Sequence, residues 1–312
     1  MPKFEAAIAH GPASNPLQVP AERPADGVVD MQTVTSISGG KTSSYMALKY
    51  PTDLYVFALV RSNHPELAPT NSSLLAYCED KSPGFIGTYE APETLQALRE
   101  VEQMIGSEIK WLSAEYALED YVFGATDVPN YRSGKPYLYN KRTRFCTIEQ
   151  KIKPISRYCW LNSDGAPVVQ NIGFRWDEPK RVEGWNCGND VSKIATSCGM
   201  KPTDRWEYQN IEWRVSDFPL YRDRVTKLDV LKFWENKSVT FPDISNCVMC
   251  PIHQDSELRK QRKLYPKHYA VAVAQESAVE GHYFGSRSIV ERTEDPGFDQ
   301  PSLFSCLCSD SK

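Results

Sequence analysis

One segment constrains this chain more than any other: an apolar stretch that ends in a Ser-Gly-Gly turn and opens directly into a helical pattern. Residues 32–37 are β-branched and bounded by glycine, which predicts a buried strand. Residues 43–50 have a helical pattern that stops at Pro51, and residues 54–60 form an apolar run of strand length. A strand, a loop, a helix and a strand in this order predict the start of a parallel α/β sheet.

The turn after the first strand has the residue types that an anion site needs. Glycines let the backbone approach a phosphate closely. The N–H groups at a helix start point toward the anion, and the helix dipole favours negative charge there. The turn therefore predicts an adenine-type nucleotide held through its phosphates by Ser38, Gly39, Gly40, Lys41, Thr42 and Ser43. It is not a Walker A loop, because Gly-x-x-x-x-Gly-Lys-Ser/Thr does not match. A glycine-rich turn without a ligand is the alternative.

Hydrophobic patterns predict the other elements. Helical patterns cover 92–105, 147–160 with a kink at Pro154, 226–235 with Thr226 as its cap, and 254–276 with a break near Pro266. Strand patterns cover 109–112, 168–174 and 206–215, and residues 184–204 read as a long loop of the kind that often forms a lid. The predicted organisation is a proline-rich arm (1–30), a nucleotide-binding α/β domain (31–215), a C-terminal helical segment with cysteines (216–292) and a tail (293–312).

Composition narrows the class of protein. The chain of 312 residues has a formal net charge of −4, so a basic footprint over the whole protein for nucleic acid is absent. No run of about 18 apolar residues is present, so no membrane span is expected. The N-terminus lacks a signal-peptide pattern, and the expected location is the cytoplasm. An odd number of cysteines, nine, argues against a disulfide framework and favours metal or redox roles for a subset.

Two cysteines stand out by their spacing. Cys247 and Cys250 form a Cys-x-x-Cys before a proline and a predicted helix, which suits a shared metal or a redox dithiol. A zinc site and a reduced structural pair without metal both fit the same spacing.

The ordered set of motifs resembles the PP-loop N-type ATP pyrophosphatases, and more narrowly the phosphoadenosine-phosphosulfate (PAPS) reductase family. The phosphate loop resembles the PP-loop, and four further segments over residues 32–277 match in the right order. These are Asn63-His64-Pro65-Glu66, Arg144-Phe145-Cys146 with Lys151 and Pro154, Gly173-Phe174-Arg175-Trp176-Asp177-Glu178 with Arg181, and Cys247-Val248-Met249-Cys250-Pro251. The resemblance implies an adenine nucleotide alpha hydrolase-like α/β fold, with a mostly parallel central sheet flanked by helices.

The sequence departs from that family in three places. Thr42 stands where the pyrophosphatase loop usually has Asp. A single Cys146 stands where iron–sulfur sulfonucleotide reductases have a Cys-Cys pair, and the Glu-Cys-Gly-x-His tail of the family is missing. These departures leave the nucleotide-binding fold in place and leave the reaction open.

The resemblance implies that Cys146 lies near the Cys-x-x-Cys, so Cys146, Cys247 and Cys250 become candidate metal ligands and catalytic residues. A 4Fe–4S cluster on these three thiolates would have one iron without a protein thiolate. Such an iron resembles the arrangement in cluster-dependent tRNA thiolation enzymes, where it is thought to hold sulfur. The alternative fourth ligands are Cys187, Cys198, Cys306 and Cys308.

Charged residues add candidates for anion binding. Arg175 and Arg181 follow a predicted strand, where open α/β sheets bind ligands, and arginine suits phosphate or sulfate. Because they flank Asp177 and Glu178, a surface turn of salt bridges is the alternative. Gly173 belongs to the same candidate nucleotide site. Two basic stretches could steer a tRNA or DNA acceptor, although such runs are more often solvated helix faces; they contain Lys135, Lys141, Arg142 and Arg144, and Arg259, Lys260, Arg262, Lys263, Lys267 and His268.

Three functions fit the sequence. The first is a PAPS-reductase-like enzyme that reduces a sulfonucleotide or transfers sulfur. The second is an ATP pyrophosphatase that uses ATP and Mg²⁺ to adenylate a nucleic-acid or small-molecule acceptor for thiolation. The third is a nucleotide-binding or scaffold module without catalysis. A homo-oligomer is compatible with each of them.

Overall fold

The computed structural model of the chain describes residues 31–124, 136–185, 191–197, 207–244, 247–283 and 287–294. For 191–197 and 207–209 it describes the backbone alone. The predicted arm (1–30), the tail beyond residue 294, and four of the cysteines lie outside the described residues; these cysteines are Cys187, Cys198, Cys306 and Cys308.

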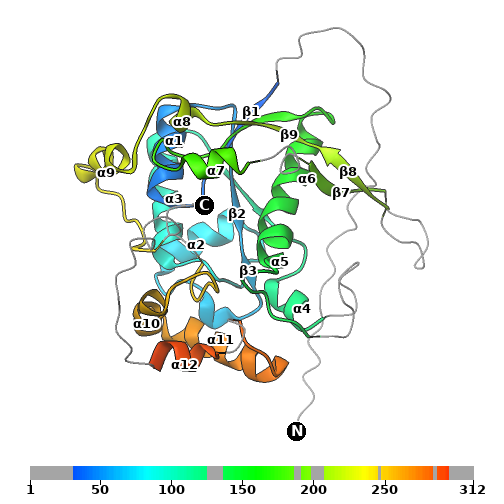
Figure 1. The fold of residues 1–312 in the computed structure, drawn as a ribbon, viewed down its shortest axis with the longest axis vertical. Helices are drawn as coiled ribbons and strands as arrows, with labels where there is room; N and C mark the ends of the chain where they lie inside the picture. The colour runs from blue at the N-terminus through cyan, green and yellow to red at the C-terminus, as the bar shows by residue number, and fades with distance from the viewer. Residues whose placement is uncertain are drawn as a thin grey trace.

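A five-stranded parallel sheet forms the centre of the molecule (Figure 1). Its strand order is β5-β2-β1-β6-β9, with β1 in the middle. Thr33 of β1 pairs with Val169 of β6, and Val34 pairs with Leu54 of β2, all in parallel register. The strands are β1 (Thr33–Ser36), β2 (Leu54–Leu59), β5 (Ile109–Ser113), β6 (Val168–Asn171) and β9 (Arg214–Asp217).

Helices cover both faces of the sheet, because alternate strand residues face opposite sides. On one face, Tyr55 and Phe57 pack with α1 (Lys41–Lys49), α2 (Ser72–Lys81) and α3 (Pro92–Ile105). On the other, Val56 and Val34 pack with α6 (Lys153–Asn162). The fold is therefore α/β with a parallel sheet flanked by helices, as predicted.

The remaining elements are short or lie at the ends of the sheet. Two antiparallel pairs are β3 (Arg61–Ser62) with β4 (Gly87–Thr88), and β7 (Val191–Ser197) with β8 (Glu207–Glu212). The helices are η1 (Pro65–Leu67, 3₁₀), α4 (Leu118–Val122), α5 (Phe145–Thr147), η2 (Ile148–Ile152, π), α7 (Pro179–Glu183), α8 (Pro219–Arg222), α9 (Lys227–Glu235), α10 (Asp255–Leu264), α11 (Pro266–Val279) and α12 (Ile289–Glu294). None of these described helices has the length and apolar character needed to cross a membrane.

Two predictions of secondary structure differ from the structure. The segment 184–204, predicted to be a loop, contains β7, which pairs with β8. The single strand predicted over 206–215 is two strands, β8 and β9, separated at the buried Trp213, because β8 pairs with β7 while β9 joins the main sheet. Tertiary pairing thus overrides a local composition that is typical of loops.

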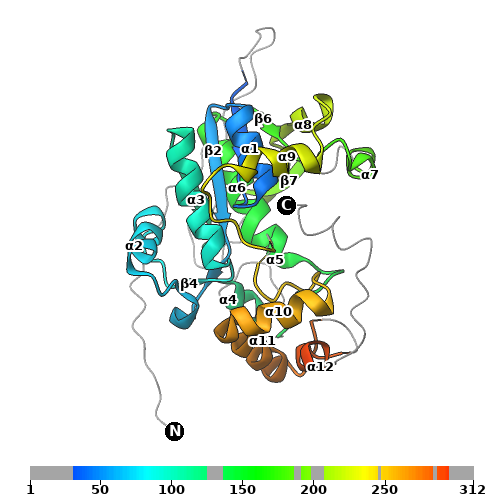
Figure 2. The same cartoon turned by 90° about the vertical axis from the view of Figure 1, so that its left-hand side faces the viewer.

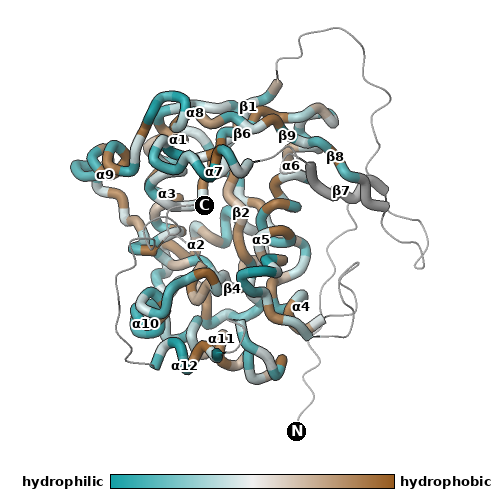
Figure 3. The backbone as a smooth tube through the Cα atoms, in the orientation of Figure 1, coloured by the Kyte–Doolittle hydropathy of each residue, from teal (hydrophilic) through white to brown (hydrophobic). Residues whose placement is uncertain are grey.

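The helices α10, α11 and α12 pack at the end of the molecule opposite α1, α8 and α9 (Figures 1 and 2). They share one hydrophobic core with the N-terminal half, in which Leu258 and Val271 lie with Val60, Tyr89 and Leu118. The surface of α10 is largely hydrophilic, whereas β2 inside the sheet is hydrophobic (Figure 3). The structure therefore joins the C-terminal segment to the half that contains the parallel sheet through a common core.

Candidate functional site

The strand order places the predicted phosphate loop at a topological switch point. From β1 the chain proceeds outward through β2 to β5, and it then returns to the other side of β1 as β6. Ligands of open α/β sheets bind at such points, beyond the carboxyl ends of the strands. The segments 38–43 and 172–175 follow the neighbouring strands β1 and β6, so the structure brings together two candidate segments that are far apart in sequence.

Gly39 shapes the loop. Its φ of +72° lies in the left-handed region, and a Cβ there would approach Thr94 Cγ2 to 2.5 Å and the Thr94 carbonyl oxygen to 2.9 Å. Gly40 follows as the N-cap of α1 and has an extended backbone. No side chain caps the start of this helix. The backbone N–H groups of the first turn of α1 therefore keep the capacity to bind an anion.

Serine side chains hold the loop in its curve. The Ser38 backbone N–H donates to Ser43 Oγ (3.1 Å), and the two hydroxyl oxygens lie 3.0 Å apart. The Ser43 hydroxyl in turn donates to the Gly40 carbonyl (3.1 Å). These bonds preorganise the loop before any ligand binds.

Arg175 ties the segment after β6 to the phosphate loop. Its side chain is 1% exposed, and Nη1 donates to Thr42 Oγ1 (3.0 Å) while Nε donates to Asp177 Oδ1 (3.2 Å). Thr42, which replaces the usual Asp of the loop, is thus the partner of a buried guanidinium. Gly173 lies against the same threonine, since a Cβ on it would meet Thr42 Cγ2 at 3.7 Å.

Arg181 is also held by protein groups. Its Nη1 donates to Glu178 Oε1 (2.8 Å), and its guanidinium lies 4.0 Å from the centre of the Phe174 ring. Because Arg175 and Arg181 both have carboxylate partners, their contribution in this structure is to position the loop and the turn after β6. Direct phosphate binding by either stays a prediction.

A pocket of about 750 Å³, including its open mouth, begins beside the loop. One wall is the ends of β1 and β2, with Ser36, Ile37, Ser38, Phe57 and Ala58. The other wall comes from α5, η2 and α6, with Arg144, Thr147, Lys151 and Ile155. It combines an apolar floor with two cationic side chains, which suits a flat base that carries an anion.

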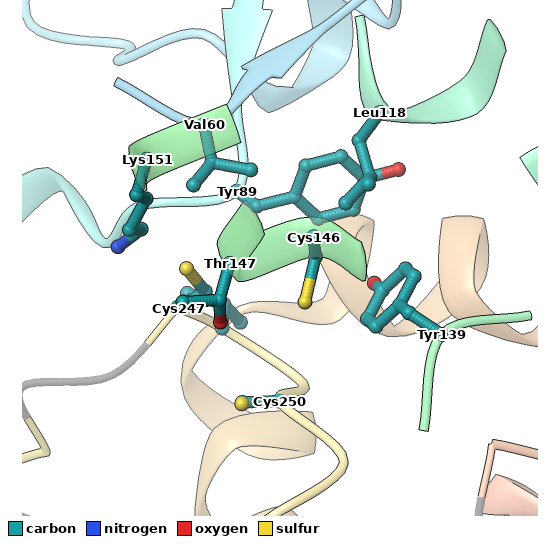
Figure 4. A pocket seen from close by; sticks show the side chains of 10 residues that line it. Val60, Tyr89, Leu118, Tyr139, Cys146, Thr147, Lys151, Cys247 and Cys250 are labelled. Carbon is teal, nitrogen blue, oxygen red and sulfur yellow. The ribbon is translucent and has the colours of Figure 1, made fainter. Parts of the chain in front are cut away.

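The three candidate cysteines line a second pocket of about 330 Å³, including its open mouth (Figure 4). Cys146 belongs to α5, and Cys247 and Cys250 belong to the chain that leads into α10. The structure therefore confirms that Cys146 lies close to the Cys-x-x-Cys. Val60, Tyr89, Leu118 and Tyr139 complete much of the lining, so the thiols face a mainly apolar cavity.

The two pockets share the wall formed by Thr147 and Lys151. Lys151 Nζ donates to Glu90 Oε1 (2.9 Å), and the Cys247 thiol donates to the same oxygen (3.4 Å). The Glu90 side chain is 1% exposed. Burial alone would lower the pKa of the Lys151 ammonium, but Cys247 and Glu90 beside it raise that pKa overall, so Lys151 is a cation.

The other described cysteines behave differently. Cys78 and Cys159 are buried in the cores on the two faces of the sheet, and burial raises the pKa of each thiol to about 12. They are therefore inert small hydrophobic residues. All five described cysteines are free thiols.

No group of three or more His, Cys, Asp or Glu side chains within the described ranges is arranged to hold a single metal ion. In an iron–sulfur cluster each thiolate binds a different iron, so cluster ligands lie farther apart than ligands of one ion. Three thiols spaced around one cavity suit the ligands of a cluster. In the described part of the chain they do not form a compact zinc site among themselves.

The predicted basic stretches are partly neutralised. Lys260 pairs with Asp243 (2.5 Å) and Arg262 pairs with Glu294 (3.3 Å). His268 is buried and lies against the Thr88 carbonyl (3.1 Å), so it is a structural residue. In the first stretch Arg144 lines the pocket beside the loop, whereas Lys135 lies outside the described residues.

Sequence reasoning missed two residues of the site. Glu90 follows β4 without any motif around it, and no local signal marks it. Thr147 lies four residues before Lys151 on a helical pattern, and that spacing could have placed both side chains on one face.

No protein-family model matches the chain, and no curated protein matches it in sequence. Among solved structures it is similar to the U34-tRNA thiolase NcsA from Methanococcus maripaludis, determined with its 4Fe–4S cluster. The identity is 14%, the TM-score is 0.33, and the match covers 85% of this chain and 80% of the other. A likeness this distant does not establish function, so the assignment below depends on the residues of this chain.

Proposed function

We propose that this chain is an adenine-nucleotide-dependent enzyme of sulfur transfer. Its phosphate loop at 38–43 binds the nucleotide, and Cys146, Cys247 and Cys250 handle sulfur. The observation that carries the proposal is a shared wall: Thr147 and Lys151 line both the loop-side pocket and the cysteine pocket. A nucleotide-activated group and a thiol centre are thereby adjacent.

The reaction that fits best is adenylation followed by thiolation. An acceptor oxygen attacks the α-phosphorus of ATP, pyrophosphate leaves, and a sulfur nucleophile then displaces AMP. The loop N–H groups hold the phosphates, the Ser38 and Ser43 hydroxyls keep the loop in shape, and Arg144 offsets the charge that develops. ATP chemistry of this kind uses Mg²⁺ to neutralise the leaving pyrophosphate.

The cysteine pocket fits an iron–sulfur cluster held by Cys146, Cys247 and Cys250. Three cysteines that form no disulfide converge on it from two separate segments, and its lining is mainly apolar. Bound there, a cluster with three protein ligands would supply an iron that is open to sulfur. Glu90 accepts a hydrogen bond from the Cys247 thiol, and Lys151 balances the negative charge of Glu90.

A second candidate, reduction of a sulfonucleotide, is supported by the two cations next to Ser38. Arg144 and Lys151 suit a sulfate as well as a phosphate. In that reaction a thiolate attacks the sulfur and the nucleotide leaves as a phosphate anion, which gives an S-sulfonated cysteine. A second thiolate then attacks the sulfur of that cysteine, sulfite leaves, and the disulfide that forms between the two cysteines accounts for the two electrons. In the adenylation reaction the acceptor is a polynucleotide or a small molecule. A cytoplasmic location and a homo-oligomer remain predictions.

Anaerobic preparation of the whole chain tests the proposal. Iron and acid-labile sulfide are measured in the wild type, in Cys247→Ser and in the control Cys159→Ala, whose thiol is buried away from the pocket. We expect loss of iron in Cys247→Ser alone. Iron-free wild-type protein would remove the cluster from the proposal.

Two activity assays on the same protein then separate the reactions. Exchange of labelled pyrophosphate into ATP with candidate acceptors supports adenylation, and release of sulfite from a sulfonucleotide supports reduction. Neither activity, in a protein that binds ATP, would favour a binding module instead of an enzyme.

A further inference from the structure

An exposed tryptophan lies on the turn between β6 and α7. Trp176 is 43% exposed, and it directly follows Arg175, whose guanidinium is bonded to Thr42 of the loop. The Trp176 backbone N–H donates to the Val225 carbonyl (2.9 Å), and the next residue, Asp177, accepts from the Lys227 N–H (3.2 Å). These two bonds hold the backbone of the turn against one neighbouring segment and leave the indole exposed.

Neighbouring groups make one aromatic and cationic surface with this indole. The Tyr221 ring lies 4.9 Å from the Trp176 ring at 41°, and the Arg224 guanidinium lies 5.4 Å from the indole centre. Trp176, Tyr221 and Arg224 are called here the indole platform. Its residues come from the turn before α7 and from the end of α8, in the half of the molecule that contains α1 (Figures 1 and 2).

Arg224 occupies a position where glycine is the usual residue. The Arg224 N–H donates to the Tyr221 carbonyl and the Val225 N–H donates to the Leu220 carbonyl, which is the helix-ending arrangement that requires a left-handed residue. The φ of Arg224 is +56°, so the chain accepts backbone strain in order to have a long cation there.

The charge around the platform is available to a ligand. Arg222 is paired with Asp217 (2.8 Å), but no carboxylate lies within ion-pair distance of Arg224 in the described ranges. Lys180 of α7, four residues after Trp176, is also exposed. An exposed indole with an arginine over its face is the chemistry that stacks a nucleobase and attracts its phosphate.

We propose that the indole platform binds an unpaired base of a polynucleotide acceptor, with the adjoining phosphate held by Arg224. This inference rests on the proposed function, because the polynucleotide bound at the platform would be the acceptor that the bound nucleotide activates. Trp176 directly follows Arg175, whose guanidinium contacts Thr42, so one short segment of chain holds both the platform and the loop.

Binding of a fluorescein-labelled single-stranded RNA oligonucleotide of mixed sequence to the whole chain tests this inference by anisotropy. Trp176→Ala should weaken binding about 5- to 150-fold, while Trp176→Phe keeps most of it. Phe123→Ala is the matched control, since Phe123 is also an exposed aromatic residue (41%). ATP affinity, measured in the same variants, should not change.

Arg224→Gly gives a second, independent result. It should weaken oligonucleotide binding and raise the Tm by about 2–4 °C, because glycine relieves the strain at a positive φ. Glu280→Gly, at a left-handed residue that ends α11, should raise the Tm without any change in binding.

Three results would overturn the inference: no oligonucleotide binding by the wild type, equal binding by Trp176→Ala, or equal loss of ATP and oligonucleotide. The titration needs no turnover, so failure of the exchange assay and failure of the indole platform are separate results.

Discussion

At the scale of single residues, the phosphate loop depends on Gly39 for two reasons that can be separated. Its positive φ disfavours any side chain, and Thr94 fills the space that a Cβ would need. Gly84 has the same sign of φ (+78°) with nothing within 4 Å of its Cβ position, so it isolates the backbone effect alone.

We predict that Gly39→Ala lowers the free energy of unfolding by about 2–4 kcal/mol, from backbone strain and from the overlap with Thr94. Gly84→Ala should lower it by about 1–2 kcal/mol, from strain alone. Urea denaturation measures both. Equal losses in the two variants would show that Thr94 yields and does not confine the loop.

The ion pair between Lys151 and Glu90 joins the two pockets and is unequally buried. The Lys151 side chain is 18% exposed and the Glu90 side chain 1%. Removing the lysine alone would leave a carboxylate in the interior without its cation, which costs more than removing both charges.

We therefore expect Lys151→Met to lower the free energy of unfolding by about 2–4 kcal/mol. This is less than the cost of breaking a fully buried ion pair, because Lys151 reaches some solvent. The double variant Lys151→Met/Glu90→Gln should regain most of that loss. Chemical denaturation of the two variants, in a double-mutant cycle with Glu90→Gln, gives the coupling. Additive losses would mean that the pair contributes nothing to stability.

At the scale of elements, sequence patterns found what is local and missed what depends on partners. Thr226 was predicted to cap a helix through Glu235, and the structure has Thr226 and Asp229 in a capping box before α9. The helix predicted over 147–160 is divided into the π-helical η2 and α6, and Pro154 is the second residue of α6, where a proline is tolerated. The strand β7 was missed because its stability comes from pairing with β8, which no local pattern encodes.

The candidate site divides in the same way. The phosphate loop and the Cys-x-x-Cys are contiguous in sequence, and both were predicted. Glu90 was not predicted, because it lies 157 residues from Cys247 in sequence and the two side chains meet only in the folded protein. Arg175 and Arg181 flank Asp177 and Glu178 in sequence, which left a salt-bridged turn open as the alternative to anion binding, and the structure has these carboxylates as their partners.

The contact between α11 and β4 predicts a dependence of stability on pH. His268 of α11 lies against the Thr88 carbonyl, and burial lowers the pKa of its imidazole, an effect that the bond to Thr88 partly offsets. A lowered histidine pKa in the folded state means that the unfolded chain takes up the proton first. Stability from this group is therefore full above the unfolded value of about 6.5 and is lost as the pH falls through the folded value.

We predict that the free energy of unfolding falls more steeply between about pH 7.5 and about pH 5 in the wild type than in His268→Gln. Glutamine keeps an N–H donor for Thr88 but does not titrate. Because all other titrating groups are common to both proteins, the difference between the two slopes belongs to His268. Parallel pH profiles would contradict this assignment.

At the scale of the whole molecule, the predicted division at residue 215 crosses a shared core. Leu258 of α10 and Val271 of α11 pack in one cluster with Tyr89 and Leu118 from the N-terminal half. The Val248 N–H donates to the Tyr89 carbonyl (2.8 Å), so the cysteine-bearing segment is bonded as well as packed against the sheet end. The cysteine pocket lies at this junction, with ligand candidates from both sides of it.

That arrangement predicts that the C-terminal helices and the sheet end unfold together. Leu258 is completely buried, and Leu258→Ala should lower the free energy of unfolding by about 2–5 kcal/mol. Native-state hydrogen exchange should then speed up at Tyr89 and Leu118 as well as along α10 and α11, because one core supports all of them. Ala97 in α3, which packs outside this cluster, is the reference position. Faster exchange confined to α10, α11 and α12 would show that the C-terminal segment opens alone, and the cysteine pocket would then open with it while the phosphate loop stays folded.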